Sequence, residues 1–530
     1  FICICIYKNL SVSQLPNTDM QKKGRKTMFS RVICAAILGV CAELVYVETD
    51  ISNGLPAFDM VGLLSSEVKE SRERVKTAIR NSGVLLPPRR ITVNLFPAGL
   101  RKEGGAFDLS IAAGILIAAN QVVPMLDMEK TLIAGELSLD GRVNHICGVL
   151  PMVLEGKKKG LSHFILPMED VREAEIVEDV TITGVADIAG MMLALRGEGN
   201  VCDRVEEYGR TTEEKTYKTD FADIAGQENL KRAVEIAAAG MHNMLLIGPP
   251  GAGKSMIASA IPGILPKPGL EECIEITKIH SIAGILDGNA LMRVRPFRAP
   301  HHTITQKALV GGGKKVRPGE LTLAHGGVLF LDEFAEFKRD TIDALRQPLE
   351  EHRVVISRVY GICVFPADVM LVAATNPCKC GYYPDRNRCS CSGYDVKKYQ
   401  GKFRGPLTDR MDICVAVPEV SIEDLQKGKK SESSETVRKR VEAAAAIQKE
   451  RYRGQQVRFN SGLSQDQIQK YCFLGEKEKS LLGQAFKQLG MSARAYYKTI
   501  RVARTIADLE GCEDIRECHI AEALGYRMTD

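Results

Sequence analysis

The run MLLIGPPGAGKS, from Met244 to Ser255, constrains the fold more than any other part of this chain. Its apolar start predicts a buried strand, and the rest matches the P-loop pattern of a glycine, four residues and then Gly-Lys-Ser. In a P-loop, backbone N–H groups wrap phosphate oxygens, Lys254 reaches the β- and γ-phosphates, and the Ser255 hydroxyl joins Mg²⁺. The full match in a strand–loop–helix context favours this interpretation over a chance glycine-rich turn. The predicted nucleotide-binding residues are Gly248, Pro249, Pro250, Gly251, Ala252, Gly253, Lys254 and Ser255.

A second apolar run, GGVLFLDEF, ends in two carboxylates. Val328 to Leu331 is apolar throughout, as expected for a strand buried on both faces of a parallel sheet. Asp332 suits Mg²⁺, directly or through water, and Glu333 suits polarising the attacking water. Alone, the pair could be a solvated strand edge, but the P-loop favours the catalytic interpretation.

A third apolar run, VMLVAATNP, ends in the polar pair Thr375 and Asn376. Asn376 could orient the attacking water from a strand beside the one that carries Asp332. The alternative is an asparagine that begins a turn before Pro377. Three strands that converge on one phosphate favour the functional interpretation.

Polar stretches divide the 530 residues, which suffice for three or more domains. The N-terminal part alternates strand-like and helix-like runs, and the last part has helical periodicity. The expected boundaries are 1–27, upstream translation or a disordered tail before a plausible start at Met28; 28–196, an N-terminal domain; 197–220, a linker; 221–420, an α/β core; 421–435, a second linker; and 436–530, a helical region.

Composition favours a cytoplasmic protein without a membrane span. The most apolar run, Val32 to Val47, is too short to span a bilayer and carries Glu43. The chain has sixteen cysteines, which show no even spacing outside one cluster. This pattern is not that of a small secreted disulfide scaffold, and it indicates a reducing compartment. The net charge of +5 permits a nucleic-acid partner but does not argue for one.

That one cluster spans residues 378–391 and has the spacing C-x-C-x8-C-x-C. Four thiolates suit one tetrahedral Zn²⁺, and the residues between the two pairs can fold back in a turn. C-x-C is less usual than C-x2-C, so unliganded thiols, a disulfide and a redox switch stay open as alternatives. The candidate zinc ligands are Cys378, Cys380, Cys389 and Cys391.

A series of long motifs resembles the magnesium-chelatase-like AAA+ ATPases of the YifB/ComM type. In chain order they are DIAGQE, GPPGAGKS, FRAPHHT, GGGKKVRPGELTLAHGGVLFLDE, LRQPLEE, LVAATNPCKCGYY, GPLTDRMDI and SARAYYKTIRVARTIADL. The resemblance covers almost everything from Met28 onward. It implies an α/β fold: an AAA+ P-loop ATPase core, an N-terminal Lon-protease-like (ribosomal S5 domain 2-like) α+β domain and a C-terminal helical lid of the magnesium-chelatase type.

The same resemblance implies a bacterial ATPase that uses ATP and Mg²⁺ and forms a homo-hexameric ring. It suggests a DNA motor, a helicase that promotes branch migration when single strands are integrated during recombination or natural transformation. Arg410 then matches the arginine finger that enters the neighbouring subunit's site, and Arg494 matches the sensor-2 arginine of the lid. Without the family context, either could be a surface charge.

The resemblance also implies a β-hairpin between the strands ending at Asp332 and Asn376, and HRVVISRVYGICVFP suits one with its turn near Tyr360-Gly361. Basic residues on this hairpin and on the loop after GGG could face a central pore and contact a phosphate backbone. The alternative is solvated loop charge. The candidates are Lys314, Lys315, Arg317 and Arg358.

The N-terminal region resembles the domain shared by Lon-type proteases and the DNA-repair ATPase RadA, most clearly in GELSLDGRVNHICGV. A Lon-type protease needs a serine nucleophile and a lysine base. Ala106-Phe107-Asp108 stands where the serine is expected, and Ser110 and Lys102 are off the pattern. We therefore expect a structural or DNA-guiding domain without proteolytic activity.

Two further readings stay open. The adjacent pair His301-His302 could bind metal, but neighbouring side chains diverge along the backbone, which favours packing or hydrogen bonding near the nucleotide. The function could instead be that of a magnesium-chelatase motor subunit or an ATP-dependent protein remodeller. The N-terminal domain and the cysteine cluster argue against the chelatase, and the missing Ser/Lys pair argues against a protease.

Overall fold

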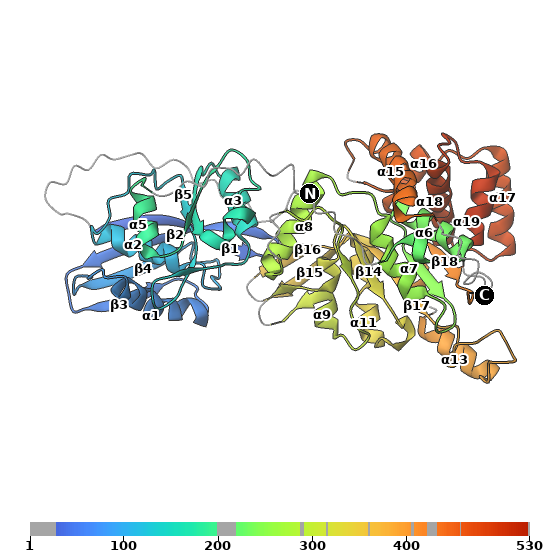
Figure 1. The fold of residues 1–530 in the computed structure, drawn as a ribbon, viewed down its shortest axis with the longest axis horizontal. Helices are drawn as coiled ribbons and strands as arrows, with labels where there is room; N and C mark the ends of the chain where they lie inside the picture. The colour runs from blue at the N-terminus through green and yellow to red at the C-terminus, as the bar shows by residue number, and fades with distance from the viewer. Residues whose placement is uncertain are drawn as a thin grey trace.

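The computed structural model describes residues 28–198, 219–286, 291–313, 316–358, 361–403, 407–420, 432–455 and 457–527. Along its long axis lie an N-terminal lobe, a central α/β core and a group of C-terminal helices (Figure 1). In the described part of the chain, no helix has both the length and the apolar character needed to cross a bilayer.

The N-terminal lobe is built on a seven-stranded sheet in the order β3-β4-β2-β1-β5-β8-β9. β1 and β2 pair antiparallel from Phe29–Asp50 to Leu38–Cys41, so the apolar run from Val32 to Val47 is a buried hairpin. β5, β8 and β9 add parallel strands on the β1 side. β6 and β7 form a short antiparallel hairpin around Asp140-Gly141. The elements of the lobe are β1 Phe29–Leu38, β2 Cys41–Ser52, β3 Ala57–Val61, α1 Ser66–Asn81, β4 Arg90–Phe96, α2 Asp108–Ala118, β5 Thr131–Ile133, β6 Glu136–Leu137, β7 Val143–Asn144, α3 Val149–Lys158, β8 His163–Pro167, α4 Val171–Ala174, β9 Thr181–Val185 and α5 Ile188–Leu195.

The core contains a five-stranded parallel sheet in the order β11-β14-β17-β10-β18. β14 and β17 are buried along their whole length, which explains why their sequences are apolar runs rather than alternating patterns. Because the strands are parallel, their carboxyl ends meet at one edge of the sheet. The elements of the core are α6 Glu228–Gly240, β10 Met244–Ile247, α7 Lys254–Ala260, α8 Leu270–Ala283, β11 Phe297–Arg298, α9 Gln306–Val310, β12 Gly311–Gly312, β13 Arg317–Pro318, α10 Glu320–Leu323, β14 Val328–Leu331, α11 Arg339–Asp343, α12 Arg346–Glu351, β15 Arg353–Arg358, β16 Gly361–Pro366, β17 Met370–Thr375, α13 Gly393–Phe403 and β18 Ile413–Ala416.

The C-terminal part is helical, as expected from its periodicity. Its longest members, α15 and α18, share one apolar cluster with α6 and the core sheet. Lys498 of α18 donates a 2.8 Å hydrogen bond to the Met411 carbonyl, which anchors the lid to the segment before β18. The lid helices are α15 Ser434–Arg451, α16 Gln465–Tyr471, α17 Glu476–Gln488, α18 Ala493–Leu509 and α19 Glu517–Gly525.

Among the described residues, the N-terminal lobe contacts the core at α8 and at the β15–β16 hairpin. The buried Glu173 carboxylate accepts a 2.5 Å hydrogen bond from the Ser281 hydroxyl of α8, and burial raises the pKa of Glu173. The β1–β2 turn lies against β16, where a Cβ on Gly39 would come within 3.5 Å of the Val364 carbonyl oxygen. The lobe therefore contacts the β15–β16 hairpin, which is the hairpin predicted to face DNA.

That hairpin is present: β15 and β16 pair antiparallel from Arg353–Pro366 to Arg358–Gly361. The shorter β12–β13 hairpin lies beside it, because a Cβ on Gly312 would come within 3.3 Å of Arg358 Nη2. Gly312 pairs with Arg317, so Arg317 and Arg358 are close neighbours. Lys314, Lys315 and Tyr360 lie outside the described residues.

Candidate active site

The P-loop begins where β10 ends and leads directly into α7. Gly251 and Gly253 have φ values of +78° and +81°, a region that glycine enters at low cost. This backbone opens a cavity of about 370 Å³ at the carboxyl edge of the sheet. The cavity is lined by Pro250, Gly251, Ala252, Gly253, Lys254, Ser255, Met256, Asp332, Glu333, Ala374, Thr375 and Asn376.

Lys254 is held at the base of this cavity. Its ammonium group donates to the carbonyls of Gly248 (2.8 Å) and Pro249 (2.7 Å) and to Asn376 Oδ1 (3.1 Å). Burial lowers the pKa of Lys254 below its usual value. The bond to Asn376 joins the P-loop to the end of β17, so the two sequence-predicted residues do meet.

Ser255 and Asp332 provide oxygen ligands of the kind that Mg²⁺ prefers. The Ser255 hydroxyl donates a 2.6 Å hydrogen bond to Asp332 Oδ2, and the Glu333 backbone N–H donates to Asp332 Oδ1 at 2.8 Å. Both carboxylate oxygens of Asp332 are therefore oriented at the cavity rim. These two side chains could hold Mg²⁺, with phosphate and water completing an octahedral shell.

Glu333 is adjacent to this pair but has a different partner. Its backbone is left-handed, with φ at +50°. Glu333 Oε2 lies 3.1 Å from His302 Nδ1. The histidine pair thus has polar partners, as the hydrogen-bonding alternative expects, and its response to a nucleotide stays a prediction. His301 Nδ1 lies 2.9 Å from the Thr303 hydroxyl, so the two histidines have different partners.

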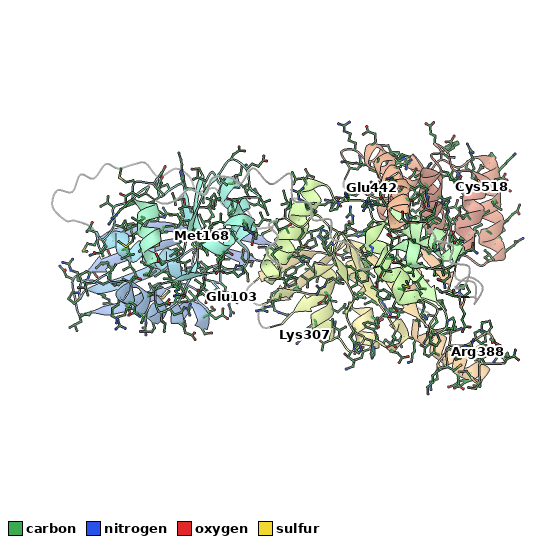
Figure 2. All side chains as sticks on the ribbon, in the orientation of Figure 1. Glu103, Met168, Lys307, Arg388, Glu442 and Cys518 are labelled. Atoms are coloured by element: carbon green, nitrogen blue, oxygen red, sulfur yellow. The ribbon has the colours of Figure 1, made fainter. Side chains whose placement is uncertain are left out.

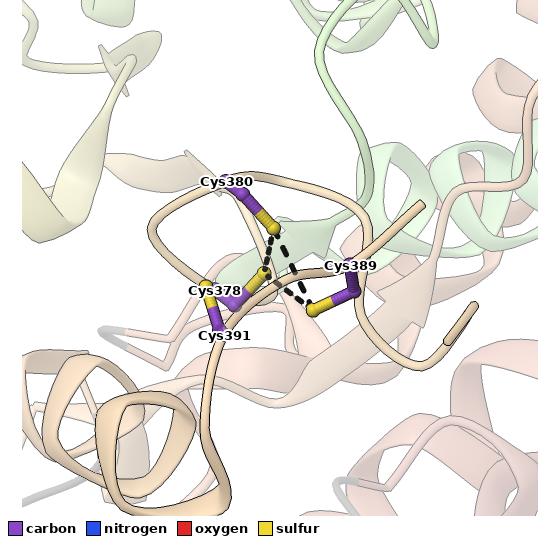
Figure 3. Close-up of side chains that lie close together, drawn as sticks. All are labelled: Cys378, Cys380, Cys389 and Cys391. Carbon is purple, nitrogen blue, oxygen red and sulfur yellow. Dashed lines mark hydrogen bonds between the residues drawn. The ribbon is translucent and has the colours of Figure 1, made fainter. Parts of the chain in front are cut away.

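The four cysteines of the predicted zinc site converge directly after β17 (Figure 3). The sulfur of Cys378 lies 3.3 Å from that of Cys380 and 3.8 Å from that of Cys389, and the last two are 3.5 Å apart. All four sulfurs lie within 4.8 Å of one another. A tetrahedral site with Zn–S bonds of about 2.3 Å requires sulfurs roughly 3.8 Å apart. The arrangement fits Zn²⁺, and the separations are too long for a disulfide, whose S–S bond is about 2.05 Å.

The cysteine loop also touches the P-loop. Gly381 has φ at +91°, and a Cβ on it would come within 2.5 Å of Pro250 Cδ. The loop leads into α13, which projects from the core (Figure 1). Arg388 lies on this projection (Figure 2) and is held by Glu419 at 2.7 Å, with its guanidinium 4.0 Å from the centre of the Tyr382 ring. The cysteine loop therefore packs against Pro250 of the P-loop.

The two predicted arginines are not in this cavity. Arg410 and Arg494 both contact Glu350, at 2.6 Å and 2.8 Å. Asn243, just before β10, donates to the Arg410 carbonyl, whereas the P-loop follows β10. One strand of four residues, about 13 Å long, therefore separates Arg410 from the P-loop.

The N-terminal lobe does not pair the two residues that a Lon-type protease would need. The Ser110 hydroxyl donates to the Phe107 carbonyl at 2.8 Å. The buried Lys102 ammonium instead donates to the Pro97 carbonyl. Each side chain thus has its own backbone partner, which is consistent with a structural role for the lobe.

Three contacts were outside the reach of sequence reasoning: Glu333 with His302, Gly381 with Pro250, and Glu350 with the two arginines. FRAPHHT and LRQPLEE were recognised as motifs, but no spacing links them to their partners.

Three family profiles match the chain in order. Residues 47–170 match "Subunit ChlI of Mg-chelatase", residues 220–425 match "Magnesium chelatase, subunit ChlI", and residues 431–527 match its C-terminal part. Together the profiles cover the lobe, the core and the lid.

Whole-length relatives agree with these matches. Competence protein ComM of Haemophilus influenzae is 40% identical, over 94% of this chain and 97% of its own length. The uncharacterized protein YifB of Salmonella typhimurium is 40% identical, over 93% of this chain and 96% of its own. The Lon protease of Salinispora arenicola is 27% identical over a shorter stretch, 30% of this chain and 22% of its own length.

Proposed function

This chain belongs to the magnesium-chelatase-like AAA+ ATPases of the YifB/ComM type, and from that membership we propose that it is a ring-forming motor acting on DNA in the bacterial cytoplasm. The observation that carries the ATPase is the convergence of Lys254, the Ser255–Asp332 pair and Glu333 on one cavity. The DNA substrate is supported by the relation to a competence protein and by the paired basic hairpins.

In the proposed reaction, ATP binds with its phosphates along the P-loop backbone. Lys254 exchanges its carbonyl partners for β- and γ-phosphate oxygens. Ser255 and Asp332 would hold Mg²⁺, which would supply neutralisation of the phosphate charge. Asn376 orients the attacking water, and Glu333 accepts its proton as the water attacks the γ-phosphorus. His302 holds the Glu333 carboxylate in place. The phosphoryl group then leaves as inorganic phosphate, and ADP remains.

The ring supplies what one subunit lacks in this scheme. Charge on the transferring phosphoryl group needs arginines, and Arg410 and Arg494 lie together on Glu350, outside the cavity of their own subunit. A homo-hexameric ring would bring these two side chains to the neighbouring subunit's phosphate. Hydrolysis would then require two adjacent subunits.

We expect single-stranded or branched DNA to stimulate ATP hydrolysis. The exposed Arg317 and Arg358 would contact the phosphate backbone in the pore, so Ala at either position should weaken stimulation and make it less dependent on salt. ATPase rates measured with and without DNA at several salt concentrations test this, with Arg453→Ala as the control because that side chain is exposed on the lid.

Failure of every DNA form to stimulate the ATPase would contradict the DNA motor. Stimulation by a chelatase partner subunit or a porphyrin would favour the magnesium-chelatase motor. Stimulation by unfolded protein would favour the remodeller.

We expect the protein, purified without added zinc, to contain about one zinc per chain, as a single four-thiolate site requires. Cys389→Ser combined with Cys391→Ser removes two ligands and should release the metal. It should also loosen the cysteine loop more than the P-loop. Metal analysis and proteolysis within the loop measure both effects, and Cys518→Ser is the control because Cys518 is exposed on the lid (Figure 2). Metal-free protein with four readily alkylated thiols and full ATPase activity would contradict this expectation.

A further inference from the structure

Helix α13 buries one face and exposes the opposite one. Val396 packs against Cys378 and Cys389 of the cysteine loop, and Tyr399 and Phe403 join an apolar cluster of the core. These three side chains of the helix share one face because they are three, four and seven residues apart. The exposed residues on the opposite face are Tyr394, Lys397, Lys398 and Gly401. The helix is therefore fixed to the core while its outward face is open to solvent.

This outward face presents an aromatic ring. Tyr394 is 73% exposed, whereas tyrosine is usually at least partly buried in folded proteins. A Cβ on Gly401, two turns further along the same face, would meet no atom within 4 Å. The ring thus stands on an uncrowded surface, and exposed aromatic rings of this kind stack the bases of single-stranded nucleic acids.

Three lysines surround the exposed tyrosine. Lys397 and Lys398 follow it by three and four residues, so they are its neighbours on the helix surface. Lys379 comes from the cysteine loop. The Ser392 hydroxyl lowers the pKa of the Asp395 carboxyl, and the charges of Lys398 and Lys379 also lower it. Both lysines therefore lie near one carboxylate, and the loop and the helix contribute to the same surface.

Two other basic residues of this segment are paired with the core. Arg388 lies 2.7 Å from Glu419, and Lys402 lies 3.4 Å from Glu336. In the part of the chain that the structure describes, none of the three lysines around the tyrosine takes part in an ion pair. Their ammonium groups are compact point charges that can bind phosphate oxygens. Each nucleotide supplies both a planar base and a charged phosphate, so the combination favours a nucleic acid over an acidic peptide.

The surface is separate from the β15–β16 hairpin. Figure 1 places α13 at the end of the core away from the N-terminal lobe, whereas the hairpin lies beside the lobe. A DNA strand bound at the hairpin would therefore meet α13 as a second, distinct contact.

We propose that the outward face of α13 binds single-stranded DNA, with one base stacked on Tyr394 and backbone phosphates on Lys379, Lys397 and Lys398. This inference rests on the proposed DNA motor. It adds a contact outside the paired basic hairpins, carried by the same segment that holds the four cysteines.

Binding of labelled oligothymidine to this chain at several salt concentrations tests the proposal. Lys397→Ala combined with Lys398→Ala should reduce the slope of log K against log salt by about 1.4, since each phosphate contact of a single strand contributes about 0.7. Tyr394→Ala should weaken binding by about 5- to 150-fold with little change of slope, and Tyr394→Phe should bind like the parent because stacking needs only the ring. Lys477→Ala combined with Lys487→Ala is the matched control, since it removes two exposed lysines of α17 and should leave binding unchanged.

A further variant adds charge to the same face. Gly401→Glu places a carboxylate in open space and should weaken DNA binding, while ATP hydrolysis without DNA stays at the parent rate. Parental affinity and salt slope in the lysine, tyrosine and glycine variants, with Arg358→Ala still impaired, would overturn the α13 contact alone. No binding of oligothymidine by the parent protein would overturn the DNA motor itself. Displacement of the oligonucleotide by polyglutamate as readily as by unlabelled oligothymidine would overturn the inference in favour of an acidic protein partner.

Discussion

Glu333→Gln should lower ATP turnover by about 10²- to 10⁴-fold, the usual contribution of a positioned general base. The amide keeps the shape of the side chain but cannot accept the proton of the attacking water. Because Glu333 does not contact the P-loop lysine, ATP should still bind and should accumulate unhydrolysed on the protein. Single-turnover hydrolysis and filter binding of labelled ATP measure the two effects separately.

Two controls define this result. Glu336→Gln changes a nearby carboxylate that pairs with Lys402 at 3.4 Å outside the cavity, so it should leave turnover near the parent value. Lys254→Ala should instead weaken nucleotide binding itself, because it removes the cation that faces the phosphates. Hydrolysis by Glu333→Gln at the parent rate would show that another group activates the water.

Arg410→Ala should lower turnover by about 10³- to 10⁵-fold, the range associated with an arginine that stabilises the charge of phosphoryl transfer from a neighbouring subunit. Nucleotide affinity should change little, because Arg410 is one strand length away from its own P-loop. Steady-state ATPase rates and nucleotide titrations on the same preparation provide the comparison. Arg438→Ala is the control, since Arg438 is partly buried on α15 and pairs with Glu442.

Mixing reveals which subunit the arginine serves. Arg410→Ala subunits have intact P-loops, and Lys254→Ala subunits have intact arginines, so rings that contain both should recover some active interfaces. A purely internal role for Arg410 would leave every mixture inactive even when sedimentation shows that mixed rings form.

The P-loop, the carboxylate pair and the end of β17 could be predicted because each is a local pattern. A buried parallel strand needs an uninterrupted apolar run, and the polar residues that follow it then fall at one edge of the sheet. Lys254, Asp332 and Asn376 accordingly line one cavity. The four cysteines were predictable for the same reason, since their ligand spacing lies within a single loop.

Arg410 and Arg494 show the limit of local patterns. Motif resemblance assigned both to ATP hydrolysis, but it did not place them relative to each other. The structure puts them on one carboxylate, 60 and 144 residues away along the chain. This pairing depends on how α12, α18 and β18 pack against the rest of the fold. The spacing of these segments along the sequence does not predict which of their apolar surfaces pack together.

By itself, the sequence determined the chemistry that this chain can carry out: a strand, a glycine-rich turn and a helix that bind phosphate, two carboxylates at a strand end, and four thiols in one loop. Backbone conformation and side-chain type within a few residues are sufficient for each of these. Only the tertiary structure decided that His302 holds Glu333, that Gly381 rests on Pro250 and that Glu350 joins two arginines. Those contacts form between segments whose distance in space is set by the folding of the whole sheet and lid, because close packing brings together side chains that no local interaction links.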